Sequence, residues 1–124
     1  MWKIVNGRLL QTTDETRSRY KTRISATLLE ELKQLAIQHE THIGYLLEDG
    51  FLHMLQQGHI NYDKKNRPND RIEFRTTCDG ELLEQLREFA KLQELNLNDV
   101  IEESAKYIRV EEVKNANWRY RVEL

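Results

Sequence analysis

The sequence predicts a mainly α-helical chain with short strands, built from two strand–helix–helix repeats that pair within one chain. Two observations carry this prediction. Residues 17–24 and 71–78 alternate polar and more apolar side chains, which is typical of a strand with one buried face. Each segment then leads into apolar residues spaced i, i+3, i+4 and i+7, the pattern of a helix with one buried face. The two chain termini are expected to add a small β-sheet.

Length and composition limit the classes to which the chain can belong. Its 124 residues fit one compact domain or two very small motifs that share a core. Hydrophobic residues make up 39% and charged residues 32%, which indicates a folded, soluble chain. No apolar run approaches the ~20 residues of a membrane span, and the N-terminus does not resemble a signal peptide. A single cysteine, Cys78, fits a reducing compartment, so a cytoplasmic protein without a membrane partner is expected.

The ends of the chain are expected to lie outside the repeats. Residues 1–16 form an N-terminal β-hairpin and a connector, because Asn6-Gly7 is a preferred pair for a two-residue type I′ turn. Residues 111–124 supply a C-terminal strand, in which apolar and polar side chains alternate from residue 117 onwards. This strand is the candidate partner of the hairpin.

The first unit spans residues 17–58. Ser25 is a good N-cap for a helix that runs to about His39. Thr41 or His42 caps a second helix, Ile43–Gln57. Gly50 lies inside that helix, where glycine costs about 1 kcal/mol relative to alanine, so close packing against another helix is expected there. Gly58 fits the residue after the helix end.

A polar linker, residues 59–70, contains the only proline and separates the two units. The second unit spans residues 71–110. Asp79 caps a helix from about Gly80 to Glu94, and Asn96 or Asn98 caps a last helix that extends to about Val110.

The two units align at an offset of 54 residues without gaps. The matched pairs include strand, cap, core and helix positions: Arg17 with Arg71, Tyr20 with Phe74, Lys21 with Arg75, Ser25 with Asp79, Leu32 with Leu86, and Glu48 with Glu102. Caps and core positions agree together, which apolar periodicity alone would not supply. A duplication is therefore expected, in which two copies bury the apolar faces that one copy cannot bury alone.

Strand–helix–helix with this spacing resembles the ribbon-helix-helix family of DNA-binding proteins, the Arc/MetJ type. The tandem arrangement is similar in layout to accessory proteins of plasmid-transfer relaxosomes. The resemblance implies that the two strands pair antiparallel and enter the major groove as a β-ribbon. Residues 56–70 can reach ~50 Å when extended, so both strands can come from one chain and form an intramolecular pseudo-dimer.

The resemblance also implies the positions that contact DNA. Base-facing ribbon positions are Arg19, Lys21, Arg23, Glu73, Arg75 and Thr77, and the rows are extended by Arg17 and Arg71. Phosphate contacts fall at the N-termini of the second helices, where free N–H groups and the helix dipole favour an anion. Those positions are Thr41, His42, Ile43, Asn96 and Leu97.

The expected function is sequence-specific binding of double-stranded DNA, as a transcriptional repressor or an accessory factor that organises DNA in the nucleoid. The two unlike strands imply an asymmetric DNA site. Neither an enzyme nor a cofactor is expected, because there is no Gly-rich phosphate loop, nucleophile–base pairing or metal cluster in the sequence. His39 and His42 are spaced i, i+3 but have no further ligand in register.

Two alternatives stay open. The row of cations could be only the solvated face of an exposed strand, since charged residues blunt sheet edges. The chain could also be a protein–protein interaction module that keeps the fold without binding DNA, which the net charge of −2 and Glu73 favour. The terminal aromatic residues Trp2, Trp118 and Tyr120 are expected to form an accessory core or a self-association contact, with stacking on single-stranded bases as the other possibility.

Overall fold

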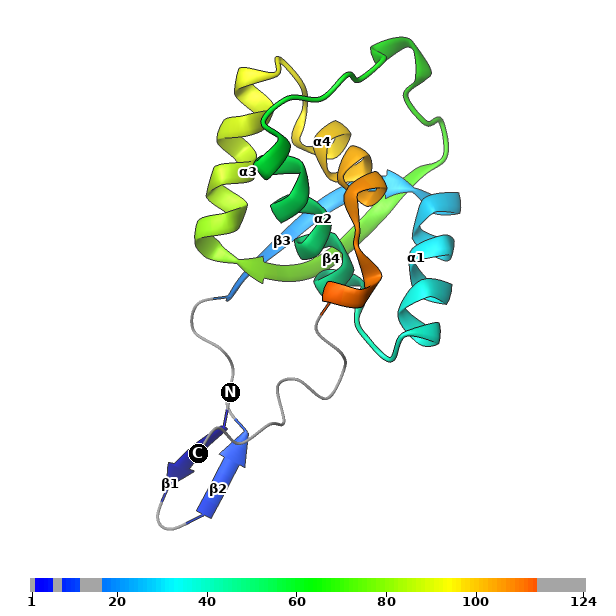
Figure 1. The fold of residues 1–124 in the computed structure, drawn as a ribbon. Helices are drawn as coiled ribbons and strands as arrows, with labels where there is room; N and C mark the ends of the chain where they lie inside the picture. Colours follow the sequence, from blue (N-terminus) through cyan, green and yellow to red (C-terminus); the bar gives the residue numbers. More distant parts are fainter. Residues whose placement is uncertain (1, 6–7, 12–16, 114–124) are drawn as a thin grey trace.

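A two-stranded antiparallel ribbon, β3 (Arg17–Ser25) with β4 (Arg71–Asp79), lies under a layer of helices (Figure 1). The computed structural model describes residues 2–5, 8–11 and 17–113. Within these residues the chain is a mixed α/β fold with four α-helices. They are α1 (Ala26–Gln38), α2 (Ile43–Gln57), α3 (Gly80–Leu92) and α4 (Leu97–Ser104).

α1 and α3, which each follow a ribbon strand, begin where the sequence predicts a cap. The Ser25 hydroxyl accepts a hydrogen bond from the Leu28 N–H at 3.3 Å, and the Asp79 carboxylate accepts one from the Leu82 N–H at 3.0 Å. Each cap satisfies one of the N–H groups that a helix start leaves without an intrahelical partner. The strand-to-helix turns are therefore fixed locally.

Both first helices also end in the same way. Glu40 and Glu94 follow α1 and α3 in the left-handed region, with φ of 50° and 56°. The next N–H in each case, from Thr41 or Leu95, donates back into the helix across 2.9 Å. This arrangement usually has glycine at the left-handed position, and here a glutamate takes its place.

The predicted end of the last helix is wrong. α4 ends at Ser104 and a short 3₁₀ turn, η2 (Ala105–Tyr107), follows it. The Ser104 carbonyl lies against α2, where a Cβ added to Gly50 would clash with its oxygen. The Ser104 hydroxyl donates to the Ile101 carbonyl at 2.5 Å. Close packing of α2 on the end of α4 accounts for both the glycine and the short helix.

The helices bury the inner face of the ribbon. α2 packs against β4 and α4 packs against β3, while α1 and α3 lie at opposite sides (Figure 1). Side chains from both strands and all four helices form one core, in which the fully buried residues are Ile24, Leu46, Leu47, Phe51, Met54, Cys78, Leu86, Val100 and Ile101.

The predicted N-terminal hairpin is present as β1 (Trp2–Val5) and β2 (Arg8–Gln11), with Val5 opposite Arg8. Its turn, residues 6–7, and the predicted strand within residues 114–124 lie outside the described residues. The predicted linker contains one 3₁₀ turn, η1 (Lys64–Asn66). The longest described helix, α2, has 15 residues, and none of the described helices has the length and apolar character to cross a membrane.

Candidate nucleic-acid interface

The outer face of the ribbon carries the row of cations that the alternation predicts. In β3, Arg19, Lys21 and Arg23 are exposed, while the single residue after each of them is buried beneath the sheet. In β4, Glu73 and Arg75 are exposed. We call these five side chains the ribbon face. It combines four cations with one carboxylate in a chain whose net charge is −2.

The register of the ribbon sets which of these side chains are neighbours. Lys21 lies opposite Arg75, and this pair is flanked by Arg23 opposite Glu73 and by Arg19 opposite Thr77. Like charges directly across a sheet destabilise it. The Lys21–Arg75 pair at the centre is therefore unfavourable unless an anion lies near it.

Glu73 is the anion within the ribbon face. Its carboxylate lies 3.4 Å from the Lys21 ammonium and 3.4 Å from the Arg75 guanidinium. The charge of Arg75 lowers the pKa of the Glu73 carboxyl, and the hydrogen bond from Lys21 adds to this effect. All three side chains are about half exposed or more, so these ion pairs contribute little to stability and exchange readily for other partners.

Arg17 does not extend the exposed row, contrary to the prediction. Its side chain is 10% exposed and forms an ion pair with Glu48 of α2. The guanidinium also donates to the Thr77 side chain at 3.1 Å and to the Thr77 carbonyl at 3.0 Å, and it lies 5.2 Å from the centre of the Tyr45 ring. Burial opposes the charge, but the hydrogen bond and charge of Glu48 raise the pKa of Arg17 above its ordinary value.

Arg71 is withdrawn from the exposed row in the same way, again contrary to the prediction. It forms an ion pair with Glu102 of α4 and donates to the fully buried Asp99 at 2.8 Å. Arg67 from the linker holds the same Asp99 carboxylate with two hydrogen bonds of 3.0 and 2.7 Å. Glu102 also accepts the Ser25 N–H at 2.8 Å, which ties α4 to the end of β3.

Thr77, the remaining predicted base-facing residue, is only partly exposed, and its hydroxyl accepts the hydrogen bond from Arg17.

The sequence did not predict several residues that shape this surface. Glu48, Asp99 and Glu102 form the ion pairs that withdraw Arg17 and Arg71 from the surface. In the sequence, each stands as an acidic residue within the buried face of a second helix.

The two predicted phosphate positions flank the ribbon. The first turn of α2 lies against β4, because a Cβ on Gly44 would be 2.6 Å from the Thr76 hydroxyl. The first turn of α4 lies against β3, where the Thr22 hydroxyl donates to the Asn98 side chain at 2.7 Å. Both helix N-termini therefore border the ribbon.

The two N-termini differ in charge. At α4, the Asp99 carboxylate accepts the Asn96 N–H at 3.1 Å, so a negative group already occupies that end. At α2, Tyr45 stands at the corresponding third position, and the cap residue His42 is exposed, with its ring 5.5 Å from that of Tyr45. Of the predicted residues at these ends, Thr41 is buried, Ile43 and Leu97 are partly buried, and Asn96 is exposed. Asp99 is paired with Arg67 and Arg71, so it occupies the N-terminus of α4 as an internal anion, and at α2 the third position is a tyrosine.

The potential metal ligands that come together in the described part of the chain are Asp49, His53 and Glu112. Both ring nitrogens of His53 already face these carboxylates, Nδ1 at 3.1 Å from Asp49 and Nε2 at 2.6 Å from Glu112. Asp49 also accepts the Arg109 N–H at 2.6 Å. These contacts link the 3₁₀ turn η3 (Val110–Glu112) to α2.

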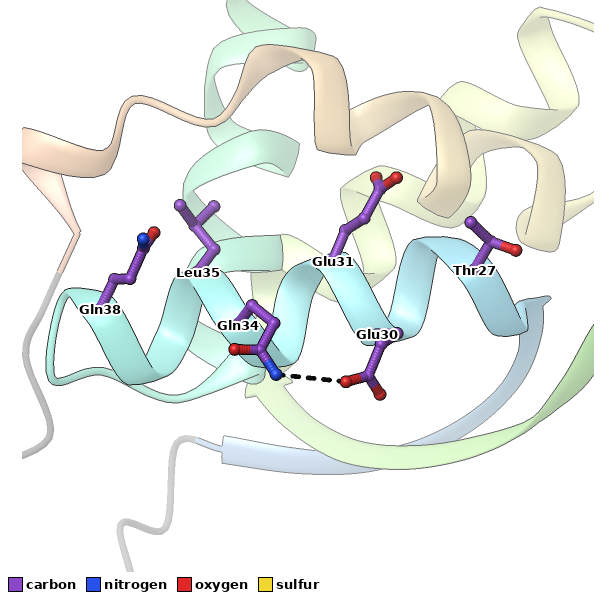
Figure 2. A pocket seen from close by; sticks show the side chains of 6 residues that line it. All are labelled: Thr27, Glu30, Glu31, Gln34, Leu35 and Gln38. Atoms are coloured by element: carbon purple, nitrogen blue, oxygen red, sulfur yellow. Dashed lines mark hydrogen bonds between the residues drawn. The ribbon is translucent and has the colours of Figure 1, made fainter.

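A pocket of about 520 Å³ lies on the outer side of α1, and all its lining residues come from that helix (Figure 2). They are Thr27, Glu30, Glu31, Gln34, Leu35 and Gln38. Gln34 donates to Glu30 at 3.2 Å. Ligand sites are usually concave, with mainly apolar walls and a few convergent polar groups. This pocket is lined by one side of a single helix.

The ribbon face, with its flanking helix N-termini, is therefore the strongest candidate site among the described residues. No family model, no curated protein and no solved structure matches this chain.

Proposed function

We propose that the chain binds double-stranded DNA by inserting the β3–β4 ribbon into the major groove, as a transcriptional regulator or an accessory DNA-organising factor. The observation that carries this proposal is the ribbon face. Four exposed cations stand on a two-stranded antiparallel ribbon, in a chain that is negative overall. The major groove admits a ribbon of this width, and arginine and lysine donate to guanine O6 and N7 there.

The proposal includes a single-chain pseudo-dimer of two duplicated units. Spacing supports it: β3 and β4 begin at residues 17 and 71, α1 and α3 at 26 and 80, and α2 and α4 at 43 and 97. All three pairs have the offset of 54 seen in the sequence alignment. The ion pairs follow the same offset, since Arg17–Glu48 in one unit corresponds to Arg71–Glu102 in the other.

Contacts near the centre of the fold support the same arrangement. Residues that lie on a two-fold axis meet their own counterparts. Lys21 lies opposite Arg75 in the ribbon, and Gly50 packs against Ser104 where α2 meets α4. Both pairs are 54 residues apart. An axis through these two contacts would relate the units and would place the ribbon symmetrically in a groove.

Within this proposal, base edges or nearby phosphates are contacted by Arg19, Lys21, Arg23 and Arg75. Arg17 and Arg71 instead link the ribbon to α2 and α4 through ion pairs. The N-terminus of α2 contacts a phosphate more readily than that of α4, because Asp99 already occupies the latter.

The experiment is selection of bound duplexes from a random pool at moderate salt, followed by affinity measurements with variants. Arg19→Ala or Arg23→Ala is expected to cost about 1–3 kcal/mol of specific binding. Arg87→Ala is the matched control, because Arg87 is an exposed arginine on α3 that pairs only with Glu84 among its described contacts. If neither ribbon variant weakens binding more than the control does, the ribbon is not the DNA-binding surface.

Glu73 favours a second candidate, a protein-interaction module that uses the same ribbon face. Its carboxylate partly neutralises Lys21 and Arg75, which suits a mixed-charge protein surface. Salt dependence separates the candidates. Phosphate-anchored binding weakens steeply as salt rises, because counterions are released from DNA. A flat salt response, or no DNA retained at low salt, would support the protein partner.

A further inference from the structure

The two ends of the ribbon face are chemically different. At one end Arg19 lies opposite Thr77, and at the other end Arg23 lies opposite Glu73. A half-turn about the central Lys21–Arg75 pair places Glu73 where Arg19 was. A carboxylate then takes the place of a guanidinium. The ribbon therefore presents different groups to a DNA site in its two possible orientations.

Glu73 is available to a ligand because its present partners are exposed surface groups. Lys21 and Arg75 are 62% and 73% exposed, and each lies 3.4 Å from the carboxylate. Arg23, which stands directly across the ribbon, instead donates to the Arg71 carbonyl at 3.0 Å. When Lys21 and Arg75 turn toward an anion, the Glu73 carboxylate is left facing whatever lies against the ribbon.

An ionised carboxylate can only accept hydrogen bonds. On the major-groove edges of DNA, the donors are the exocyclic amino groups of cytosine N4 and adenine N6. Guanine O6 and N7 and thymine O4 are acceptors and would repel it. Placing Glu73 against a base with an exocyclic amino group is therefore favourable. Placing it against the guanine edges that suit the cations is unfavourable.

We propose that Glu73 sets the orientation of this chain on DNA, by requiring a base with an exocyclic amino group at one end of an asymmetric site. The proposal rests on the DNA binding proposed above. Arg19 occupies the corresponding position at the other end and selects a guanine edge there. Arg23 and its counterpart Thr77 also differ, but Arg19 and Glu73 carry charges of opposite sign, so this carboxylate gives the nearly two-fold ribbon its direction.

The test compares duplexes selected by the wild-type chain, Glu73→Ala and Glu73→Arg. The wild type is expected to yield an asymmetric consensus with cytosine or adenine at one position. Replacing that base pair should weaken wild-type binding about tenfold, the usual scale of one mismatched pair. The same replacement should change the affinity of Glu73→Ala less than twofold. Glu73→Arg, with arginine at both corresponding positions, should select sites that are more nearly two-fold symmetric.

Glu84→Ala is the matched control, because Glu84 is an exposed glutamate that pairs with Arg87 on α3, and it should keep the wild-type consensus. Circular dichroism checks that each variant is folded. A symmetric wild-type consensus, or a base preference unchanged in Glu73→Ala, overturns the role of Glu73 while DNA binding stands. If the wild type and all variants retain no duplex even at low salt, the proposed function fails and this inference fails with it.

Discussion

At the scale of single residues, the inner face of β3 carries two buried hydroxyl groups with different surroundings. The Tyr20 hydroxyl has no hydrogen-bond partner among the described residues, although the residue is only 6% exposed. The Thr22 hydroxyl, in contrast, donates to Asn98 at 2.7 Å. Burial of an unpaired polar group costs free energy, whereas a paired one contributes about 1 kcal/mol. The unpaired hydroxyl of Tyr20 therefore lowers the stability of the fold. The residue aligned with Tyr20 at an offset of 54 is Phe74, which has no hydroxyl.

Tyr20→Phe is expected to leave the free energy of unfolding unchanged or to raise it by up to about 1 kcal/mol, because it removes only the unpaired hydroxyl. Thr22→Val is the matched comparison and should lower it by about 1 kcal/mol, since the hydrogen bond from Thr22 to Asn98 is lost. Urea unfolding of the three proteins measures both changes. A clear loss of stability in Tyr20→Phe would mean that the hydroxyl has a partner.

Asp99 links stability to pH. Burial would raise its pKa, but hydrogen bonds from Arg67 and Arg71 lower the pKa of this carboxyl from 3.8 to about 2. A carboxyl whose pKa is lower in the folded state stabilises the fold fully above its unfolded pKa. That contribution is lost as pH falls from about 4 to 2.

Asp99→Asn is expected to lower the free energy of unfolding by about 2–4 kcal/mol at pH 7, because two arginines lose a buried partner. The variant lacks this titrating group. The difference in free energy of unfolding between wild type and variant should therefore narrow as pH falls from 4 to 2. Urea unfolding at pH 7, 4 and 3 measures the gap. A constant gap across that range would contradict the assignment, and exposed Glu84→Gln serves as the control.

At the scale of elements, α1 and α3 are each closed by a glutamate in a conformation that suits glycine. Glu40 and Glu94 have φ of 50° and 56°, and both side chains are exposed. For residues other than glycine the left-handed conformation costs roughly 1–2 kcal/mol. Glycine avoids this cost but loses more conformational freedom on folding.

Glu40→Gly and Glu94→Gly are each expected to raise the free energy of unfolding by about 0.5–1 kcal/mol, as the difference between these two effects. Thermal and urea unfolding measure the change. Glu40→Gln and Glu94→Gln are the controls, because they remove the charge and keep the strain, so they should change little. If the glutamine variants match the glycine variants, charge is the cause and backbone strain is not.

At the scale of the whole molecule, neither unit is complete by itself. β3 pairs with β4, and the second helix of each unit packs against the strand of the other. An isolated unit would therefore expose one edge of its strand and the apolar faces of both its helices. Segments of about 40 residues rarely bury enough apolar surface to fold alone.

A fragment with residues 17–58 is expected to be unfolded as a monomer, and any folding should depend on concentration through self-association. Mixing it with a fragment of residues 71–113 should restore helical circular dichroism. Sedimentation and circular dichroism over a range of concentrations measure this, with the full chain as control. A half that folds as a monomer at all concentrations would contradict the proposed pseudo-dimer.

Local features of the fold could be predicted from the sequence. Alternation at residues 17–24 and 71–78 predicted the two strands, Ser25 and Asp79 predicted the helix starts, and Gly58 predicted a left-handed helix end. Each of these depends on residues within one or two helical turns, which is the range over which periodicity and capping act. The end of α4 could not be predicted, because α2 determines it from more than 50 residues away.

The sequence by itself determined the elements, their order and a row of cations along one strand. Only the tertiary structure decided which cations remain exposed. Arg17 and Arg71 belong to the same alternating pattern as Arg19 and Arg23, yet ion pairs with α2 and α4 withdraw them from the surface. The physical reason is that alternation fixes the face on which a side chain starts. Whether a long arginine stays there depends on a carboxylate some 31 residues further along the chain, which packing brings within reach.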